Sequence, residues 1–168
     1  MKTILILFIF LLACDKPEKP TNTFIDERDG NEYTMIEIGD NIWMGENLRY
    51  KPSGYNYLLS DKYGTFYPFN DAVQYAPKGW HLPTCAEWEA LIEVISNGYD
   101  LRAGEFAAQL GGWVQVEYLS EGRIGAWWTA DEMDDVYAYL YYIKADTDLT
   151  RINLLKTCLL TVRCVKDK

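Results

Sequence analysis

The stretch Pro77-Lys-Gly-Trp-His-Leu-Pro-Thr-Cys-Ala-Glu-Trp88 carries the strongest local structural signals in the chain. Within it, Thr84-Cys-Ala-Glu87 has the spacing of a capping box, in which each of the two polar side chains binds the other residue's backbone amide. Apolar residues then recur at helical spacing, at Trp88, Leu91, Ile92 and Ile95. We therefore expect an amphipathic helix that begins at Thr84 and ends at Asn97-Gly98.

The residues before this helix predict antiparallel strands. Asp29-Gly30 separates a strand-like run that starts at Phe24 from another over residues 33–38, which is a strong hairpin signal. Gly39-Asp40 then turns the chain into a further strand at Ile42-Trp43-Met44.

The next part of the chain predicts irregular structure and then a first, short helix. Residues 49–68 mix Tyr with Gly, Pro, Ser and Asp, which is typical of a loop with short strand pieces. Residues 72–76 predict the short helix, capped by Asn70-Asp71 and ended by Pro77.

The residues after the long helix predict a return to β structure. Residues 103–110 suggest a third short helix that stops at Gly111-Gly112. Hydrophobic alternation and β-formers then predict strands over residues 113–118, 124–129, 136–143 and 157–165. Strands followed by helices and then by antiparallel strands indicate an α+β fold.

Four tryptophans and the single histidine of the chain are expected to be structural. We predict that Trp43, Trp80, Trp88 and Trp127 fill the core and that their indole N–H groups bind backbone carbonyls. His81 is expected to lie in a packed turn, where a structural role is favoured over catalysis because no partner constellation is visible in the sequence.

The N-terminus is typical of an export signal. Residues 4–12 form an unbroken apolar run, which is far shorter than the roughly 20 residues that a membrane-spanning helix needs. Leu11-Leu-Ala-Cys14 looks like the bacterial lipobox, in which Cys14 becomes the acylated first residue after cleavage. The alternative is an ordinary cleaved signal that happens to be followed by a cysteine. We predict a signal peptide over residues 1–13, a tether over 14–22 and one domain over 23–168.

The charge and cysteine content exclude some partners. With 16 Lys and Arg against 25 Asp and Glu, the formal net charge is −9, which argues against nucleic-acid binding. With Cys14 acylated, Cys85, Cys158 and Cys164 allow three single disulfide pairings, and the sequence does not choose among them. No C-x-x-C motif is present, so we expect no zinc site and no cofactor.

Enzymatic motifs are absent from the sequence. It has no G-x-S-x-G, no phosphate-binding glycine loop and no H-E-x-x-H. The dense acidic run Asp131-Glu-Met-Asp-Asp135 has three interpretations: a solvated loop, which we favour, a calcium site, or part of a paired-carboxylate hydrolase.

A binding surface is the function that the second half of the chain favours. Aromatic rings stack on sugars and anchor protein interfaces, and carboxylates beside them add hydrogen bonds. The competing interpretation is cross-strand packing, because Tyr137, Tyr139 and Tyr141 share one strand face. The candidate ligand-binding residues are Trp113, Tyr118, Trp128, Asp131, Asp134 and Tyr137.

Five phrases, taken in this order, resemble a known family. They are Phe24-x-Asp-x-Arg-Asp-Gly-x-x-Tyr33, Ile38-Gly-x-x-x-Trp-Met-x-Glu-Asn-Leu48, the segment 77–88, Trp127-Trp-Thr129 and Val162-Arg-Cys-Val165. Together they resemble the Fibrobacter succinogenes major paralogous domain, which occurs in exported lipoproteins of Fibrobacter and Bacteroidetes. The Leu-Pro-Thr-x-x-Glu-Trp element also recurs in formylglycine-generating enzymes and other proteins of the C-type-lectin-like fold.

The resemblance implies a C-type-lectin-like fold with its terminal strands paired. Family members often carry a cysteine at the position of Ala76, and the resemblance implies that it pairs with the cysteine that corresponds to Cys164. That disulfide is not expected here, because Ala76 replaces the first cysteine. The resemblance to formylglycine-generating enzymes suggests an oxidase, but Cys158 and Cys164 lack the surrounding motif of those enzymes.

These expectations combine into one functional hypothesis. The chain is expected to be a lipoprotein of the bacterial envelope, at the outer membrane or cell surface, held by acylated Cys14 and binding a glycan or a surface protein without catalysis. The alternatives are a carboxylate-dependent polysaccharide hydrolase and a purely structural envelope protein.

Overall fold

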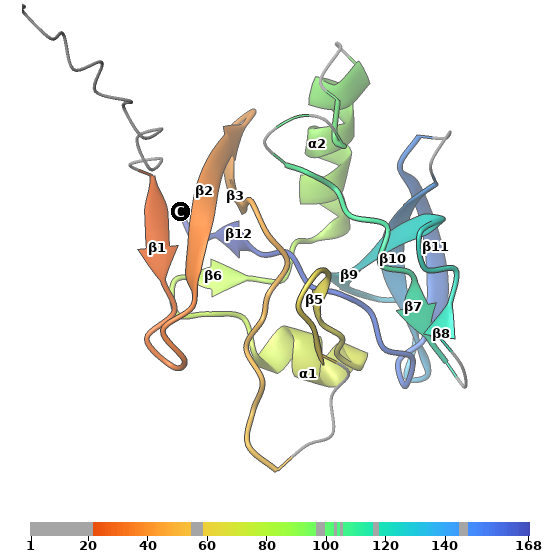
Figure 1. Cartoon of the computed structure of the whole chain (residues 1–168). Helices are drawn as coiled ribbons and strands as arrows, with labels where there is room; N and C mark the ends of the chain where they lie inside the picture. The colour runs from red at the N-terminus through yellow and green to blue at the C-terminus, as the bar shows by residue number, and fades with distance from the viewer. Residues whose placement is uncertain are drawn as a thin grey trace, which may run out of the picture.

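The fold is built on two main antiparallel sheets with a helix at each end of the space between them (Figure 1). The computed structural model describes residues 22–54, 59–96, 100–102, 104, 106–115, 118–144 and 148–168. Predictions for the signal peptide, Cys14 and most of the tether therefore fall outside the described residues, as does the predicted helix end at Asn97-Gly98.

The first sheet contains the N-terminal strands and the last strand of the chain. Its order is β1-β2-β3-β12-β6, and all its pairings are antiparallel. The strands are β1 (Thr23–Ile25), β2 (Glu32–Ile38), β3 (Asn41–Met44), β6 (Trp80–His81) and β12 (Val165–Lys166). The expected hairpin at Asp29-Gly30 is confirmed, with Phe24 opposite Tyr33 and Gly30 at a φ of 75°.

The second sheet is formed by the second half of the chain, in the order β11-β10-β9. Its strands are β9 (Ile124–Glu132), β10 (Tyr137–Lys144) and β11 (Thr150–Leu155). The structure also contains two short hairpins, made by β4 (Leu59–Ser60) with β5 (Gly64–Thr65) and by β7 (Trp113–Val114) with β8 (Tyr118–Leu119). The mixed α and β class with antiparallel sheets is thus confirmed.

The described residues form two helices, α1 (Phe69–Gln74) and α2 (Cys85–Ser96). The capping box of α2 is confirmed: Thr84 N donates to Glu87 Oε2 at 2.8 Å, and Glu87 N donates to Thr84 Oγ1 at 3.2 Å. Helix α1 begins earlier than predicted, after Pro68, and no side chain caps it, so the predicted cap at Asn70-Asp71 is wrong.

Three other expected elements differ from the structure. The predicted helix over residues 103–110 is absent: in the described residues, Ala108 N closes a loop onto Leu101 O, and Ala107 has a φ of 44°, which a right-handed helix excludes. The predicted strand over residues 113–118 is wrong, because β7 covers only Trp113–Val114 and Tyr118 starts a second, antiparallel strand, β8. Residues 157–165 make single bridges to three different segments before joining β12, because this segment crosses between the sheets.

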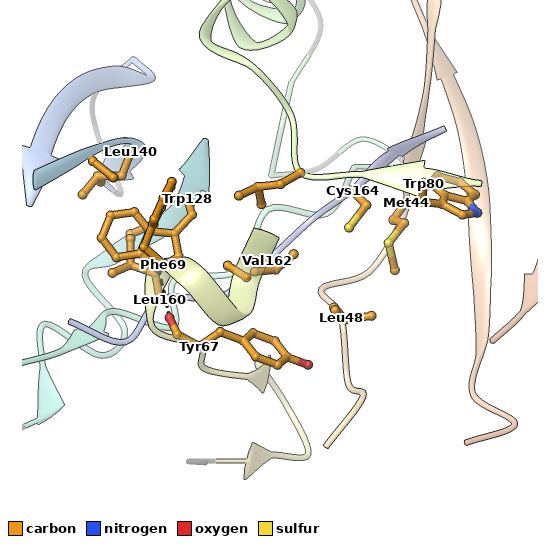
Figure 2. Packing of buried hydrophobic residues seen from close by; sticks show 14 of the residues in the cluster. Met44, Leu48, Tyr67, Phe69, Trp80, Trp128, Leu140, Leu160, Val162 and Cys164 are labelled. Atoms are coloured by element: carbon orange, nitrogen blue, oxygen red, sulfur yellow. Dashed lines mark hydrogen bonds between the residues drawn. The ribbon is translucent and has the colours of Figure 1, made fainter. Parts of the chain in front are cut away.

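Two hydrophobic clusters fill the interior. The α1-side core contains Phe69 and Trp128 together with residues from β3, β6, β10 and the C-terminal segment, and Figure 2 shows Phe69 packed against Trp128 beside Leu160. The α2-side core contains Trp43, Trp88 and Trp127.

All four tryptophans predicted to be buried are buried, but their hydrogen bonding differs from the prediction. Trp127 Nε1 donates to a side chain, Asn47 Oδ1, at 2.8 Å. Nε1 of Trp43 and of Trp88 has no hydrogen-bond partner among the described residues.

No helix among the described residues combines the length and the apolar character that crossing a membrane requires.

Candidate binding face

One face of the second sheet gathers aromatic and polar side chains. Side chains alternate along a strand, so β10 directs Ala138 and Leu140 into the α1-side core and places its odd-numbered tyrosines on the opposite face. The strand register sets residues of β11 beside these rings, with Tyr139 opposite Asn153 and Tyr141 opposite Arg151. We call this surface the tyrosine face, formed by Tyr137, Tyr139, Tyr141, Arg151 and Asn153.

Helix α2 covers one end of the tyrosine face. Trp88 stacks on Tyr141 with ring centroids 5.5 Å apart, and Tyr141 Oη donates to Glu89 Oε1 at 3.4 Å. Burial, with the nearby negative charge of Glu89, raises the pKa of Tyr141 to about 12. Arg151 Nη1 forms an ion pair with Glu89 at 3.0 Å. Tyr141 is therefore part of the α2-side core and unavailable to a ligand.

The other end of the tyrosine face is open. Tyr137 is 38% exposed, and Tyr139 is partly exposed with the Arg151 guanidinium 5.4 Å from its ring centre. Asn153 is exposed beside Tyr139. This end thus offers two aromatic rings with a cation and an amide near them, held in position by the pairing of β10 with β11. Such a surface can stack on an apolar ligand face while hydrogen bonding its polar groups.

The two predicted acidic ligand residues have structural hydrogen bonds. Asp131 accepts a 2.5 Å bond from the backbone N–H of Cys85, the first residue of α2, where a negative charge stabilises the helix dipole. Asp134 accepts bonds of 2.7 Å from the backbone N–H groups of Tyr137 and Val136, and these bonds lower its pKa. The acidic run is therefore the ordered β9–β10 turn region.

The predicted aromatic ligand residues are dispersed. Trp128 is fully buried, and its Nε1 donates to Tyr67 O at 2.9 Å, so the prediction that Trp128 faces a ligand is wrong. Trp113 packs against the α1-side core from the β7–β8 hairpin. Tyr118 begins β8, and its side chain lies outside the described part. Of the six predicted residues, the structure places Tyr137 on the open end of the tyrosine face and Asp131 beside the face, under α2.

His81 has a more specific environment than the sequence indicated. Its Nδ1 lies 2.7 Å from Asp167 Oδ1, and its Nε2 lies 2.9 Å from Glu87 Oε1. Partial burial opposes protonation of the imidazole, but the hydrogen bonds to Asp167 and Glu87 outweigh it and raise the pKa of His81. The histidine thus ties the C-terminal segment to the start of α2. Because Asp167 is distant in sequence, no local pattern could reveal this contact.

The three cysteines of the described residues form no disulfide. Cys85, Cys158 and Cys164 are free thiols, which answers the pairing question left open by the sequence. Burial raises the pKa of all three, so none is activated as a thiolate. Among the described residues, no group of three or more His, Cys, Asp or Glu side chains is arranged to hold a metal ion.

Comparison with known protein families finds a match for part of the chain. Residues 36–107, which include the end of β2, strands β3 to β6 and both helices, match the family model of the Fibrobacter succinogenes major domain. No curated protein and no solved structure matches the chain. The match contains the segment 77–88 and its capping box, which the structure shows to position α2. The chain therefore contains a Fibrobacter succinogenes major domain over residues 36–107.

Proposed function

We propose that this chain is a lipid-anchored protein of the bacterial cell envelope whose domain binds a glycan through the open end of the tyrosine face, without catalysis. The observation that carries the proposal is the exposure of Tyr137 and Tyr139 beside Arg151, which the unbroken pairing of β10 with β11 holds next to each other. A surface-protein ligand is the alternative, since the same rings could anchor a protein interface.

The anchor rests on the sequence around Cys14. The short apolar run, the small residue Ala13 and the following cysteine occur in the order that the lipobox requires. Stable anchoring takes more than one acyl chain, and an acylated N-terminal cysteine would supply several. The tether of residues 14–22 reaches at most about 30 Å, so the domain would stay close to the bilayer, at the outer membrane or cell surface.

We further propose that the domain has a C-type-lectin-like fold. Support comes from the return of the C-terminal strand β12 to the first sheet and from two helices within the first part of the chain. The implied pairing of the terminal strands differs in detail, since β12 lies between β3 and β6 and does not pair with β1. In such folds variable loops and strands present a binding surface while the core stays constant.

A glycan array tests the proposed function and separates its rivals. The protein for the array is residues 23–168, labelled and applied as the unmodified domain and as Tyr139→Ala. Binding that depends on Tyr139, with no change in the immobilised glycans, supports the proposal. Release of products from a bound glycan would favour the carboxylate hydrolase, and absence of binding across envelope and plant polysaccharides would favour a structural protein or a protein ligand.

Two control variants sharpen the array. Tyr139→Phe keeps the ring and should keep most of the binding, because stacking depends on the ring face. Val73→Ala removes an exposed apolar side chain from α1, which packs on the side of the second sheet opposite to the tyrosine face, and should bind as the unmodified domain does. Thermal unfolding of every variant shows whether it is folded, so that a loss of binding can be distinguished from a loss of folding.

A further inference from the structure

The second sheet has one long, open edge. Strand β11 is its outer strand, because the order of the sheet is β11-β10-β9 (Figure 1). The pairing of β10 with β11 is antiparallel and unbroken over residues 150–155. Among the described residues, no strand and no isolated bridge pairs with the outer side of β11. The strand therefore presents one set of backbone groups at the edge of the sheet.

The hydrogen bonds between β10 and β11 show which backbone groups these are. Lys156 N donates to Val136 O at 3.0 Å, one residue beyond the paired strands, so the even-numbered residues of β11 direct their backbone groups toward β10. The odd-numbered residues consequently direct theirs outward. Arg151 and Asn153, which are both exposed, thus each present an N–H and a C=O at the edge.

The other edges of the two main sheets are short or covered. In the first sheet, the edge strands β1 and β6 contain only three and two residues. On the outer side of β9, Ala130 N donates to Pro83 O at 2.8 Å. By contrast, β11 has six residues with neither a proline nor a bulge, and its single charged side chain, Arg151, is held in an ion pair with Glu89. Strand β11 thus lacks the features that usually protect an edge from pairing.

The core-facing side chains of β11 are incompletely covered. Ile152 and Leu154 pack against the α1-side core but are only partly buried, whereas Ala138 and Leu140 of the neighbouring strand are fully buried. A further strand beside β11 would cover more of Ile152 and Leu154 and would bind the outward backbone groups. The backbone and the apolar side chains of β11 therefore both favour one more strand.

The sequence of β11 is complementary to itself in an antiparallel pair. With Ile152 opposite Ile152 of a second copy, each Arg151 lies opposite Asn153 of the other copy, so no like charges meet. The same register brings Asp148, which is exposed just before the strand, opposite Lys156 of the second copy. A pair centred on Arg151 would instead set two guanidinium groups against each other. Charge therefore favours β11 of a second copy as the occupant and selects the register.

The charged pair at each end of this register is compatible with the existing contacts. Lys156 Nζ lies 2.6 Å from Glu132 Oε2 within its own copy. An ammonium group has three N–H donors, so Lys156 can also bind Asp148 of the second copy. Within the described part of the chain, no ion pair involves the carboxylate of Asp148. Asp148 is thus available for a contact between copies.

We propose that the free edge of β11 pairs with β11 of a second copy of this chain, around a two-fold axis beside Ile152. Arg151 and Asn153 of opposite copies exchange backbone hydrogen bonds, and the two three-stranded sheets become one continuous sheet. The axis is perpendicular to the sheet, so the tyrosine faces of both copies point the same way. Two such faces would bind a glycan bivalently; this consequence rests on the proposed function, whereas the pairing itself does not.

Sedimentation equilibrium of the full chain, purified in detergent, tests the pairing. At physiological ionic strength, where salt screens the repulsion between two negatively charged copies, it should show a monomer–dimer equilibrium in the micromolar range. Asn153→Pro removes an outward N–H without removing a bond to β10, and should abolish the dimer. Asn153→Ala keeps this N–H and should retain the dimer. Thermal unfolding shows whether both variants are folded.

A charge variant tests the contacts at the ends of the register. Asp148→Lys sets a like charge opposite Lys156 at both ends of the pair, and should raise the dissociation constant of the dimer about fivefold. Asp135→Lys makes the same change at an exposed position of the β9–β10 turn and is the matched control. It should leave the dissociation constant nearly unchanged.

Cross-linking tests the register itself. Ile152→Cys places two thiols directly opposite each other across the two-fold axis, so oxidation should link the copies covalently. Asn153→Cys is the matched control, because its two thiols are diagonal to each other. Their Cα atoms would be about 7–8 Å apart, which a disulfide does not span without movement of the backbone.

Three results would overturn the proposal. The first is a monomer at every concentration, which would leave the edge of β11 to a strand of a different protein. The second is a dimer that Asn153→Pro weakens no more than Asn153→Ala does. The third is cross-linking of Asn153→Cys in place of Ile152→Cys. Glycan binding by a monomeric protein would leave the proposed function intact, and a dimer that binds no glycan would leave the pairing intact, so the two proposals fail separately.

Discussion

Asn47 Oδ1 accepts a 3.1 Å hydrogen bond from Nε of Arg163, and both side chains are buried, with exposures of 6% and 1%. The same oxygen accepts the indole N–H of Trp127, and Arg163 Nη1 donates to the carbonyl of Phe106, over whose ring the guanidinium lies at 4.2 Å. One amide thus joins the segment after β3, strand β9 and the C-terminal segment. Three phrases that lie far apart in the sequence, around Asn47, Trp127 and Arg163, therefore meet in the structure.

Asn47→Ala should therefore destabilise the domain by about 3 kcal/mol, because it leaves a buried guanidinium and an indole N–H without their shared acceptor. Urea unfolding, followed by tryptophan fluorescence, measures the change. Asn153→Ala is the matched control, since Asn153 is exposed on β11 and should change stability by less than about 0.5 kcal/mol. Equal effects of the two variants would mean that the buried network contributes nothing.

The capping box gives a second stability prediction. Thr84→Ala removes the acceptor for Glu87 N and should cost about 1 kcal/mol, the usual value for a lost N-cap. The midpoint of thermal unfolding checks this value. Thr150→Ala removes an exposed threonine that starts β11 and should leave the midpoint nearly unchanged. A neutral Thr84→Ala would show that Asp131 alone satisfies the start of α2.

The contacts of His81 predict a dependence of stability on pH. The raised pKa of His81 means that its contribution is fully present below the unfolded value of 6.5 and is lost as the pH rises through the higher folded value. Burial opposes ionisation of Glu87, but its bonds from Thr84 and His81 outweigh this and lower its pKa. Its contribution is therefore present above 4.5 and is lost as the pH falls through the lower folded value.

The link between α2 and the C-terminal segment should consequently be strongest between about pH 4.5 and 6.5. His81→Gln removes this link and should lower the free energy of unfolding at pH 5.5. The difference in unfolding free energy between the variant and the unmodified domain should become smaller as the pH rises toward 9. Because His81 is 37% exposed, we expect this difference to be less than about 1 kcal/mol. Urea unfolding at pH 5.5 and pH 9 measures it, and a larger difference at pH 9 would reverse the predicted sign.

The anchor has its own test in cells. Cys14→Ala should prevent acylation, so the protein should no longer take up a labelled fatty acid and should appear in the soluble envelope fraction or the medium. Cys85→Ala is the control and should stay labelled and membrane-bound, because Cys85 lies within the folded domain. Membrane retention of the Cys14→Ala protein would contradict the anchor.

The elements that sequence predicts well are those with local signals. The β1–β2 hairpin is specified by Asp29-Gly30, and α2 by a cap and an apolar stripe, all within a few residues of one another. Strand β11 and the crossing of residues 157–165 between sheets depend on partners far away in the chain, which local pattern does not encode.

The candidate site, like the fold, was predictable only where the signal in the sequence is local. Alternation along residues 136–143 correctly placed three tyrosines on one face, but it could not show that α2 covers Tyr141. Trp128 was predicted to bind a ligand because it belongs to the aromatic-rich second half of the chain. Strand β9 is in fact covered on both faces, so Trp127 enters the α2-side core and Trp128 the α1-side core.

Calorimetric titration of the strongest glycan from the array into the domain tests the proposed function most directly. We predict a single site whose dissociation constant rises at least about tenfold in Tyr139→Ala, the loss of roughly one stacked ring, while Tyr139→Phe and Val73→Ala bind as the unmodified domain does. Unchanged affinity in Tyr139→Ala, with the variant folded, would show that the tyrosine face is not the binding surface.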